Sequence, residues 1–151
     1  MKTIVVYTSM TGTTERMAQV ITDELTKAGD QVTMKDVFEA DAWELTSYER
    51  ILLGCYTWGD GELADEILDF HDQLENIDLT GKYAAAFGPG SSSYDQFARA
   101  VDILDETLSR KGCEIITKGL KVDTWSDDEE KIKADCVNFA QKIVHLTPQR
   151  V

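Results

Sequence analysis

The sequence predicts an α/β domain in which helices cover both faces of a doubly wound, five-stranded parallel sheet. Five apolar runs have the length of strands, and segments with a helical spacing of apolar residues alternate with them. This alternation favours parallel strands joined by right-handed crossovers, which gives a three-layer α/β/α arrangement. The predicted strands span residues 3–7, 31–36, 50–55, 82–88 and 114–122.

The predicted helices are identified by apolar residues that recur three or four positions apart. Two of them also carry start signals, in which a serine is followed three residues later by Glu or Gln: Ser126 with Glu129, and Ser93 with Gln96. A further, less regular helical segment lies at residues 40–48. The apolar positions of the four main helices are Met17, Val20, Ile21 and Leu25; Leu63, Ile67, Phe70 and Leu74; Phe97, Val101, Leu104 and Leu108; and Ile132, Cys136, Phe139 and Ile143.

The chain is predicted to form a single domain, residues 1–151, which is large enough to bury a hydrophobic core without disulfides or metals. No stretch reaches the length of a membrane span or resembles a signal peptide, so we expect a cytoplasmic monomer that does not contact membranes. Cys55, Cys113 and Cys136 have no paired spacing. This favours reduced, buried thiols over disulfides, and no metal site is expected.

The formal net charge of -13 limits the kinds of partner. A phosphate polymer would be repelled by this charge, so the composition argues against nucleic-acid binding. A basic protein partner would be attracted, but an acidic surface also simply keeps a small protein soluble. The charge by itself leaves these two explanations open.

The first predicted strand is followed by a loop rich in hydroxyl groups that opens a helix. Unsatisfied backbone N–H groups at a helix start point at one place, and the helix dipole favours an anion there. The side chains of Ser9, Thr11, Thr13 and Thr14 add further donors, and residues 9–14 include no Lys or Arg. The loop therefore predicts a phosphate site, although an ordinary helix cap has a similar composition.

Two more loops follow the third and fourth predicted strands, at the edge where the carboxyl ends of parallel strands form ligand crevices. Residues 56–61 combine Trp58 with two glycines, and residues 88–94 combine Gly, Pro and Ser with Tyr94. Either aromatic residue alone would be unremarkable. Together with a phosphate loop at the same edge, they predict a site for a planar ring system with a phosphorylated tail.

With these three loops, the sequence resembles a flavodoxin of the short-chain bacterial type over essentially its whole length. The phosphate motif of that family (Ser or Thr, any residue, Thr, Gly, any residue, Thr) matches residues 9–14, the Trp-Gly-Asp motif matches residues 58–60, and the tyrosine after the fourth strand matches Tyr94. The fifth strand lacks the long insertion of long-chain flavodoxins. The resemblance implies that FMN is bound by Ser9, Met10, Thr11, Gly12, Thr13, Thr14, Thr57, Trp58, Gly59, Asp60, Pro89, Gly90, Ser91 and Tyr94.

The resemblance further implies a low-potential carrier of single electrons that shuttles between the semiquinone and hydroquinone of FMN and is not an enzyme. Trp58 and Tyr94 would enclose the flavin ring, and the carbonyl of Gly59 would turn to accept a hydrogen bond from the half-reduced flavin. Its partners would be a basic flavodoxin reductase and basic acceptor redox enzymes, bound transiently. The acids expected to lower the potential of the second reduction step are Asp60, Glu62, Asp65 and Glu66.

Two positions depart from the commonest family pattern. Thr13 stands where Asn is usual, which changes the donors to the phosphate, and Ser91 stands where many members have Asp near the flavin. An alternative that stays open is a flavodoxin-like NAD(P)H-dependent quinone or flavin reductase, although such proteins are usually longer. A P-loop NTPase is disfavoured because Gly12 is followed by two threonines instead of Lys and Ser or Thr.

Overall fold

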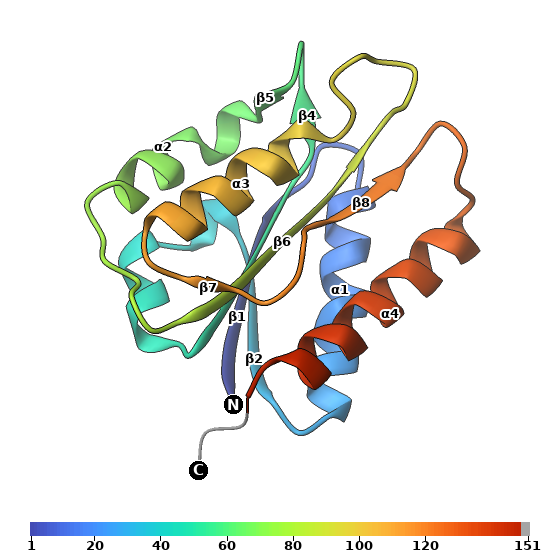
Figure 1. Cartoon of the computed structure of the whole chain (residues 1–151). Helices are drawn as coiled ribbons and strands as arrows, with labels where there is room; N and C mark the ends of the chain where they lie inside the picture. The colour runs from blue at the N-terminus through green and yellow to red at the C-terminus, as the bar shows by residue number, and fades with distance from the viewer. Residues whose placement is uncertain (149–151) are drawn as a thin grey trace.

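A parallel sheet runs through the centre of the molecule with the strand order β2-β1-β3-β6-β7 (Figure 1). The computed structural model describes residues 1–148 of the chain. The strands of this sheet are β1 (Lys2–Thr8), β2 (Gln31–Asp36), β3 (Arg50–Cys55), β6 (Tyr83–Gly90), β7 (Glu114–Ile115) and β8 (Leu120–Asp123). The order confirms the predicted doubly wound sheet. From β1 the chain first adds β2 on one side of β1, and it then crosses to add β3, β6 and β7 on the other side of β1.

The fifth strand position is divided between β7 and β8, which both pair in parallel with β6. The continuous strand predicted at 114–122 is therefore wrong in detail, because residues 116–119 lie outside both strands and, after the bond from the Ile116 N–H to the Ala84 carbonyl, the chain leaves β6. Gly119 passes so close to the helix above that a Cβ atom there would lie 2.3 Å from the Val101 side chain. Its N–H donates to Asp105 Oδ2 at 3.0 Å instead of to a strand. The break is short, and no long insertion interrupts this strand position.

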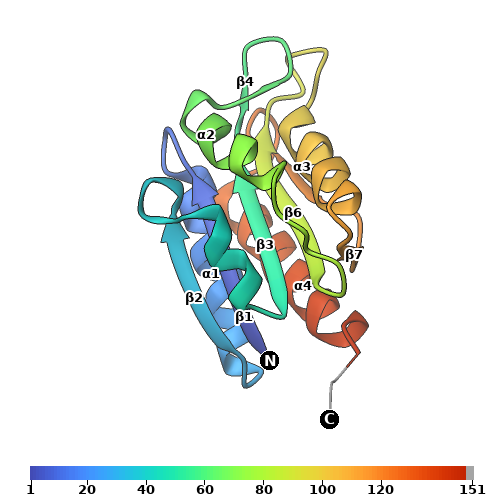
Figure 2. The same cartoon turned by 90° about the vertical axis from the view of Figure 1, so that its left-hand side faces the viewer.

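Helices cover both faces of the sheet, as predicted. The helices α1 (Thr13–Lys27) and α4 (Glu129–Leu146) lie on one face. The other face is covered by α2 (Asp65–Leu74) and α3 (Arg99–Arg110), together with two short 3₁₀ helices, η1 (Val37–Glu39) and η2 (Ala42–Ser47). Figure 1 shows the sheet between these two layers, and Figure 2 looks onto the face of the sheet from the side of α2 and α3, so that its strands lie side by side with α1 and α4 behind them.

The core is formed by alternate residues of the same strands. Val5 and Leu52 are buried against α1 and α4, whereas their neighbours Ile4 and Ile51 are buried against the opposite layer. All four side chains are completely inaccessible to solvent. Strands that are buried on both faces read as continuous apolar runs, which is why the strands could be recognised from the sequence.

The helix starts differ from the sequence signals. The helix α3 begins at Arg99 and not near Ser93, because the serines before it form a separate turn in which the Tyr94 N–H donates to the Ser91 carbonyl. The helix α4 is capped by Asp128, whose side chain accepts a hydrogen bond from the Lys131 N–H at 2.8 Å. The hydroxyl of Ser126, the predicted cap, donates to Asp123 instead.

Two further segments differ from their predicted form. Residues 40–48 contain the 3₁₀ helix η2, and a capping box between Asp41 and Glu44 fixes its start. Leu63, predicted as the first apolar position of a helix, lies in a two-residue strand before α2. This strand, β5 (Glu62–Leu63), pairs antiparallel with β4 (Thr57–Trp58).

The three cysteines are free and buried, which confirms the prediction of unpaired structural thiols. Burial raises the pKa of the Cys55 and Cys136 thiols to about 12 and that of Cys113 to about 11. Among residues 1–148, no helix has the length and hydrophobicity needed to cross a membrane.

Candidate functional site

The three loops identified in the sequence meet in one cleft at the carboxyl edge of the sheet. Its volume is about 350 Å³, within the range of small-molecule sites. Strand order explains the convergence, because β1, β3 and β6 are adjacent and each is followed by one of these loops. The predicted residues that line the cleft are Met10, Thr11, Thr13, Thr14, Thr57, Trp58, Gly59, Pro89, Gly90, Ser91 and Tyr94.

The first loop leaves the start of α1 open toward the cleft. Gly12 occupies the cap position with a left-handed backbone, φ 95°, and no side chain among the described residues caps the helix. The N–H groups of the first turn are therefore available to an anion, and the helix dipole favours one there. Thr14, which is 1% exposed, adds a hydroxyl to the cleft wall.

Ser9, which was expected to add a donor hydroxyl to the phosphate site, is not among the residues that line the cleft. Its Oγ accepts a hydrogen bond from the Gly12 N–H at 3.0 Å, which closes the loop on itself. Ser9 therefore shapes the loop. Gly12 likewise contributes a turn that only a residue tolerant of positive φ adopts easily.

A positive charge lies beside this loop, although the loop itself contains none. The guanidinium of Arg16, one turn into α1, is 3.5 Å from Thr13 Oγ1 and also 3.5 Å from Glu129 of α4. Both charged side chains are largely exposed. Residues 9–14 themselves include no Lys or Arg, but helical spacing brings Arg16, which lies outside the motif, back to the first turn of α1.

The second loop is the tip of the β4–β5 hairpin. The Gly61 N–H donates to the Trp58 carbonyl at 3.3 Å, and Gly59 has φ 54° at the first central position of this turn. A Cβ atom on Gly59 would meet nothing within 4 Å, whereas one on Gly61 would lie 2.7 Å from Gln96 Cβ. Gly59 therefore has free space around it, and Gly61 allows the hairpin to pack against the segment before α3. Asp60, also predicted as a site residue, is exposed at the tip and does not line the cleft.

The two aromatic residues are large and only partly covered. Trp58 on the hairpin is 47% exposed and Tyr94 on the loop after β6 is 69% exposed, and both line the cleft. Their exposure gives them apolar surface that a planar ligand can cover.

Four lining residues were not identified from the sequence: Tyr56, Gln96, Ala98 and Thr124. Thr124 follows β8, and the rule that carboxyl ends of strands meet at one edge, applied to the fifth strand as well, would have found it. Ala98 is placed by tertiary packing, since it has a left-handed backbone and lies against Gly90, where a Cβ atom would approach its nitrogen to 2.5 Å. No sequence pattern indicated it.

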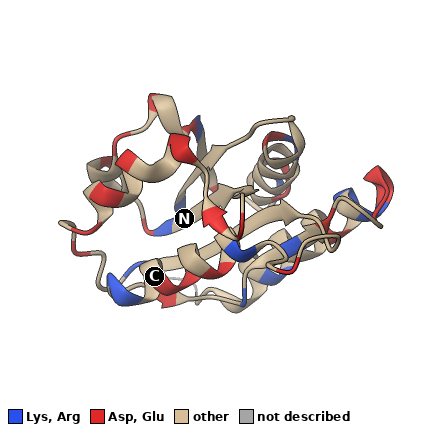
Figure 3. Cartoon of the chain, turned by 90° about the horizontal axis from the view of Figure 1, so that it is seen from above, with Lys and Arg blue, Asp and Glu red and all other residues tan. Residues whose placement is uncertain are grey.

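The rim of the cleft is acidic on the side of α2. This helix carries Asp65, Glu66, Asp69 and Asp72 and no Lys or Arg, and Figure 3 looks down on this end of the molecule. The Tyr56 hydroxyl donates to Glu66 Oε2 at 2.7 Å, which fixes one of these carboxylates beside the cleft. Burial, followed by the bond to Glu66, raises the pKa of Tyr56 above its usual range, so the phenol remains a donor.

Comparison with known proteins gives a consistent result. The family model for flavodoxin matches residues 5–136. Probable flavodoxin 2 of Bacillus subtilis is 38% identical over 145 residues, covering 93% of each chain. Among solved structures, oxidised flavodoxin 1 from Bacillus cereus matches with a TM-score of 0.91 and 38% identity over 98% of this chain and 100% of its own. Flavodoxin 2 from the same organism matches with a TM-score of 0.90 and 43% identity over 96% and 99% of the two chains.

Proposed function

Because the chain belongs to the flavodoxin family, whose members are electron carriers that bind FMN, we propose that it holds FMN in this cleft and transfers single electrons at low potential. The observation that carries the proposal is the meeting of an open helix start and two exposed aromatic side chains in one cleft. FMN supplies the one-electron redox chemistry when it is bound.

The donors in the cleft fit a phosphate. Thr11, Thr13 and Thr14 present hydroxyl groups beside the free N–H groups of α1, and such donors bind a dianion without requiring a buried counter-charge. Arg16 is close enough to add an exposed positive charge from outside the loop. These residues would hold the phosphate end of the cofactor.

The aromatic side chains fit the ring system. Trp58 and Tyr94 would cover the ring and exclude water from it. Gly59 would leave its peptide free to rotate, because its side-chain position is open and glycine tolerates both signs of φ. Its carbonyl oxygen could then accept a hydrogen bond from the ring. The acids of α2 would oppose the addition of negative charge and so favour a low potential.

We expect transient partners with basic docking surfaces, namely a flavodoxin reductase and acceptor redox enzymes. The support for this part of the proposal is the net charge of -13 and the acidic α2 beside the cleft. In the same proposal the protein acts as a monomer in the cytoplasm and is not itself an enzyme.

The cofactor is tested by titrating the apoprotein with FMN and following the quenching of flavin fluorescence. We expect saturation at one FMN per chain, and at least tenfold weaker binding for Trp58→Ala. The control is Trp43→Ala, since Trp43 is also exposed, at 58%, but does not line the cleft. A protein that takes up no FMN would contradict the proposal.

The electron-carrier role is tested with the loaded protein. We expect slow or no oxidation of NADPH until a basic flavodoxin reductase is added, and binding to that reductase that weakens as salt is raised. Rapid NADPH oxidation by the protein alone would instead support the flavodoxin-like reductase.

A further inference from the structure

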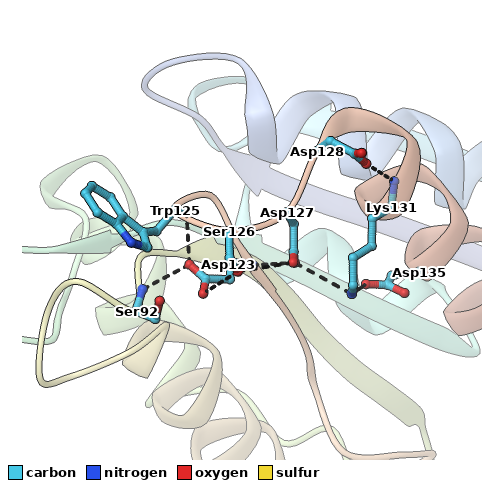
Figure 4. A network of polar contacts seen from close by, with 8 residues as sticks. All are labelled: Ser92, Asp123, Trp125, Ser126, Asp127, Asp128, Lys131 and Asp135. Atoms are coloured by element: carbon cyan, nitrogen blue, oxygen red, sulfur yellow. Dashed lines mark hydrogen bonds and ion pairs between the residues drawn. The ribbon is translucent and has the colours of Figure 1, made fainter.

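The carboxylate of Asp123, at the end of β8, lies at the centre of a hydrogen-bond network beside the cleft (Figure 4). Its Oδ1 accepts hydrogen bonds from the backbone N–H groups of Ser92 and Trp125, each at 3.0 Å. Its Oδ2 accepts from the Ser126 hydroxyl at 2.9 Å. Asp123 thereby connects the loop after β6, which carries Tyr94, with the loop after β8.

Neighbouring bonds hold Asp123 itself in place. It pairs with Gly90 in the β6–β8 ladder, and its N–H donates to Asp127 Oδ2 at 3.0 Å. The Gly90 carbonyl accepts from both the N–H and the hydroxyl of Thr124, at 2.8 and 3.0 Å. The carboxylate is therefore presented from a fixed backbone.

The loop that Asp123 contacts has few other restraints. Within it, the Tyr94 N–H donates to the Ser91 carbonyl at 3.1 Å, and the hydroxyls of Ser91 and Ser93 lie 2.5 Å apart. Ser92, Ser93 and Tyr94 are all exposed. The bond from Ser92 to Asp123 is thus a contact that ties this wall of the cleft to the sheet.

We infer that Asp123 is a positioning residue for the cofactor site: by accepting the Ser92 N–H it holds the loop that places Tyr94 over the cleft. This inference rests on the proposed function, because it takes FMN as the ligand that Tyr94 covers. The carboxylate is suited to this task because hydrogen bonds from Ser92 hold the pKa of Asp123 well below its usual range. It therefore stays an ionised, strong acceptor at any physiological pH.

Two substitutions of Asp123 test whether its side-chain acceptor is what matters for FMN binding. Asp123→Asn keeps a side-chain oxygen that can accept from Ser92, whereas Asp123→Ala removes the acceptor. We expect Asp123→Ala to weaken FMN binding about tenfold, the size expected for a lost bond to a charged group, and Asp123→Asn to stay within about threefold of the wild type. Asp23→Ala is the control, because Asp23 is exposed on α1, its carboxylate accepts a hydrogen bond from Gln19, and it does not line the cleft.

A second readout does not depend on FMN. In the apoprotein, the backbone N–H of Ser92 should exchange with solvent at least tenfold faster in Asp123→Ala than in the wild type, and Asp123→Asn should restore the protection. A change in overall stability alone would alter exchange throughout the core and would not single out Ser92.

A third variant keeps the inference testable if Asp123→Ala does not fold. Ser92 is the first central residue of the turn that runs from Ser91 to Tyr94, a position that favours proline. Ser92→Pro deletes the N–H that Asp123 accepts and leaves Asp123 unchanged, so it should also weaken FMN binding about tenfold.

The outcomes distinguish this inference from the proposed function. Failure of the wild type to bind FMN contradicts the proposed function. Wild-type affinity in Asp123→Ala or in Ser92→Pro overturns the positioning role while the proposed function stands. Loss of affinity in Asp123→Ala and Ser92→Pro, with recovery in Asp123→Asn, supports it.

Discussion

Arg50 and Asp30 form a buried ion pair at the edge of the sheet opposite the cleft. The Arg50 side chain is only 2% exposed, and its guanidinium also donates to Thr3 Oγ1 at 3.2 Å and to Thr147 Oγ1 at 3.1 Å. Burial lowers the pKa of Arg50 to about 10, so the group remains charged at neutral pH. Arg50, at the start of β3, thereby connects Asp30 just before β2 with Thr3 of β1 and with Thr147 just after α4.

Replacing Asp30, the negative partner of Arg50, should therefore destabilise the folded protein. We expect Asp30→Asn to lower the free energy of unfolding by about 3 kcal/mol, because it leaves a buried charge without a counter-ion. Urea denaturation of the apoprotein measures this. Glu75→Gln, which breaks the exposed pair with Arg110, is the control and should cost less than about 1 kcal/mol. An equal effect of the two changes would refute the buried pair as a stabilising feature.

Gly59→Ala tests whether the peptide of Gly59 must rotate so that its carbonyl can accept a hydrogen bond from the bound ring. The added methyl group meets no neighbour, so FMN should still bind, but the positive φ of 54° becomes strained and restricts the carbonyl. We expect a lower maximum of the one-electron-reduced flavin absorbance at mid-titration with dithionite. An unchanged maximum would count against a role of this carbonyl.

Arg16→Gln tests the charge beside the phosphate loop. We expect FMN binding to weaken about threefold, as for loss of an exposed ion pair, and to depend less on salt. Riboflavin, which has no phosphate, should bind the variant and the wild type equally. Arg110→Gln on α3 provides a control for net charge. If riboflavin binding falls as much as FMN binding, Arg16 does not act on the phosphate.

Asp105→Asn should make the protein more stable at neutral pH. Burial raises the pKa of Asp105, and its Oδ1 is buried without a partner among the described residues. A raised pKa in the folded state means that stability is lost as pH rises from the ordinary value of 3.8 through the folded value. The gain should be on the order of 1 kcal/mol at pH 7 and disappear below about pH 3. Denaturation at both pH values measures it, with the exposed Asp69→Asn as control; a gain that persists at low pH would exclude charge burial as its cause.

The sequence was informative wherever a local pattern has one physical meaning. Strands such as β3 are buried on both faces and so read as uninterrupted apolar runs. The loops after β1, β3 and β6 were located because a sheet of this class gathers the carboxyl ends of its strands at one edge. Helix starts were less predictable, since the Ser93 and Ser126 hydroxyls bond within the cleft-side loops instead of capping a helix.

By itself, the sequence determined the parallel α/β fold, the buried thiols and the three loops that form most of the cleft, because these depend on hydrophobic periodicity and on the order of elements. Only the tertiary structure decided which distant groups meet there. Gly61 packs against Gln96, and Asp123 accepts the Ser92 N–H across 31 positions of the chain. Such contacts follow from the docking of one loop on another, and no local spacing of residue types encodes them.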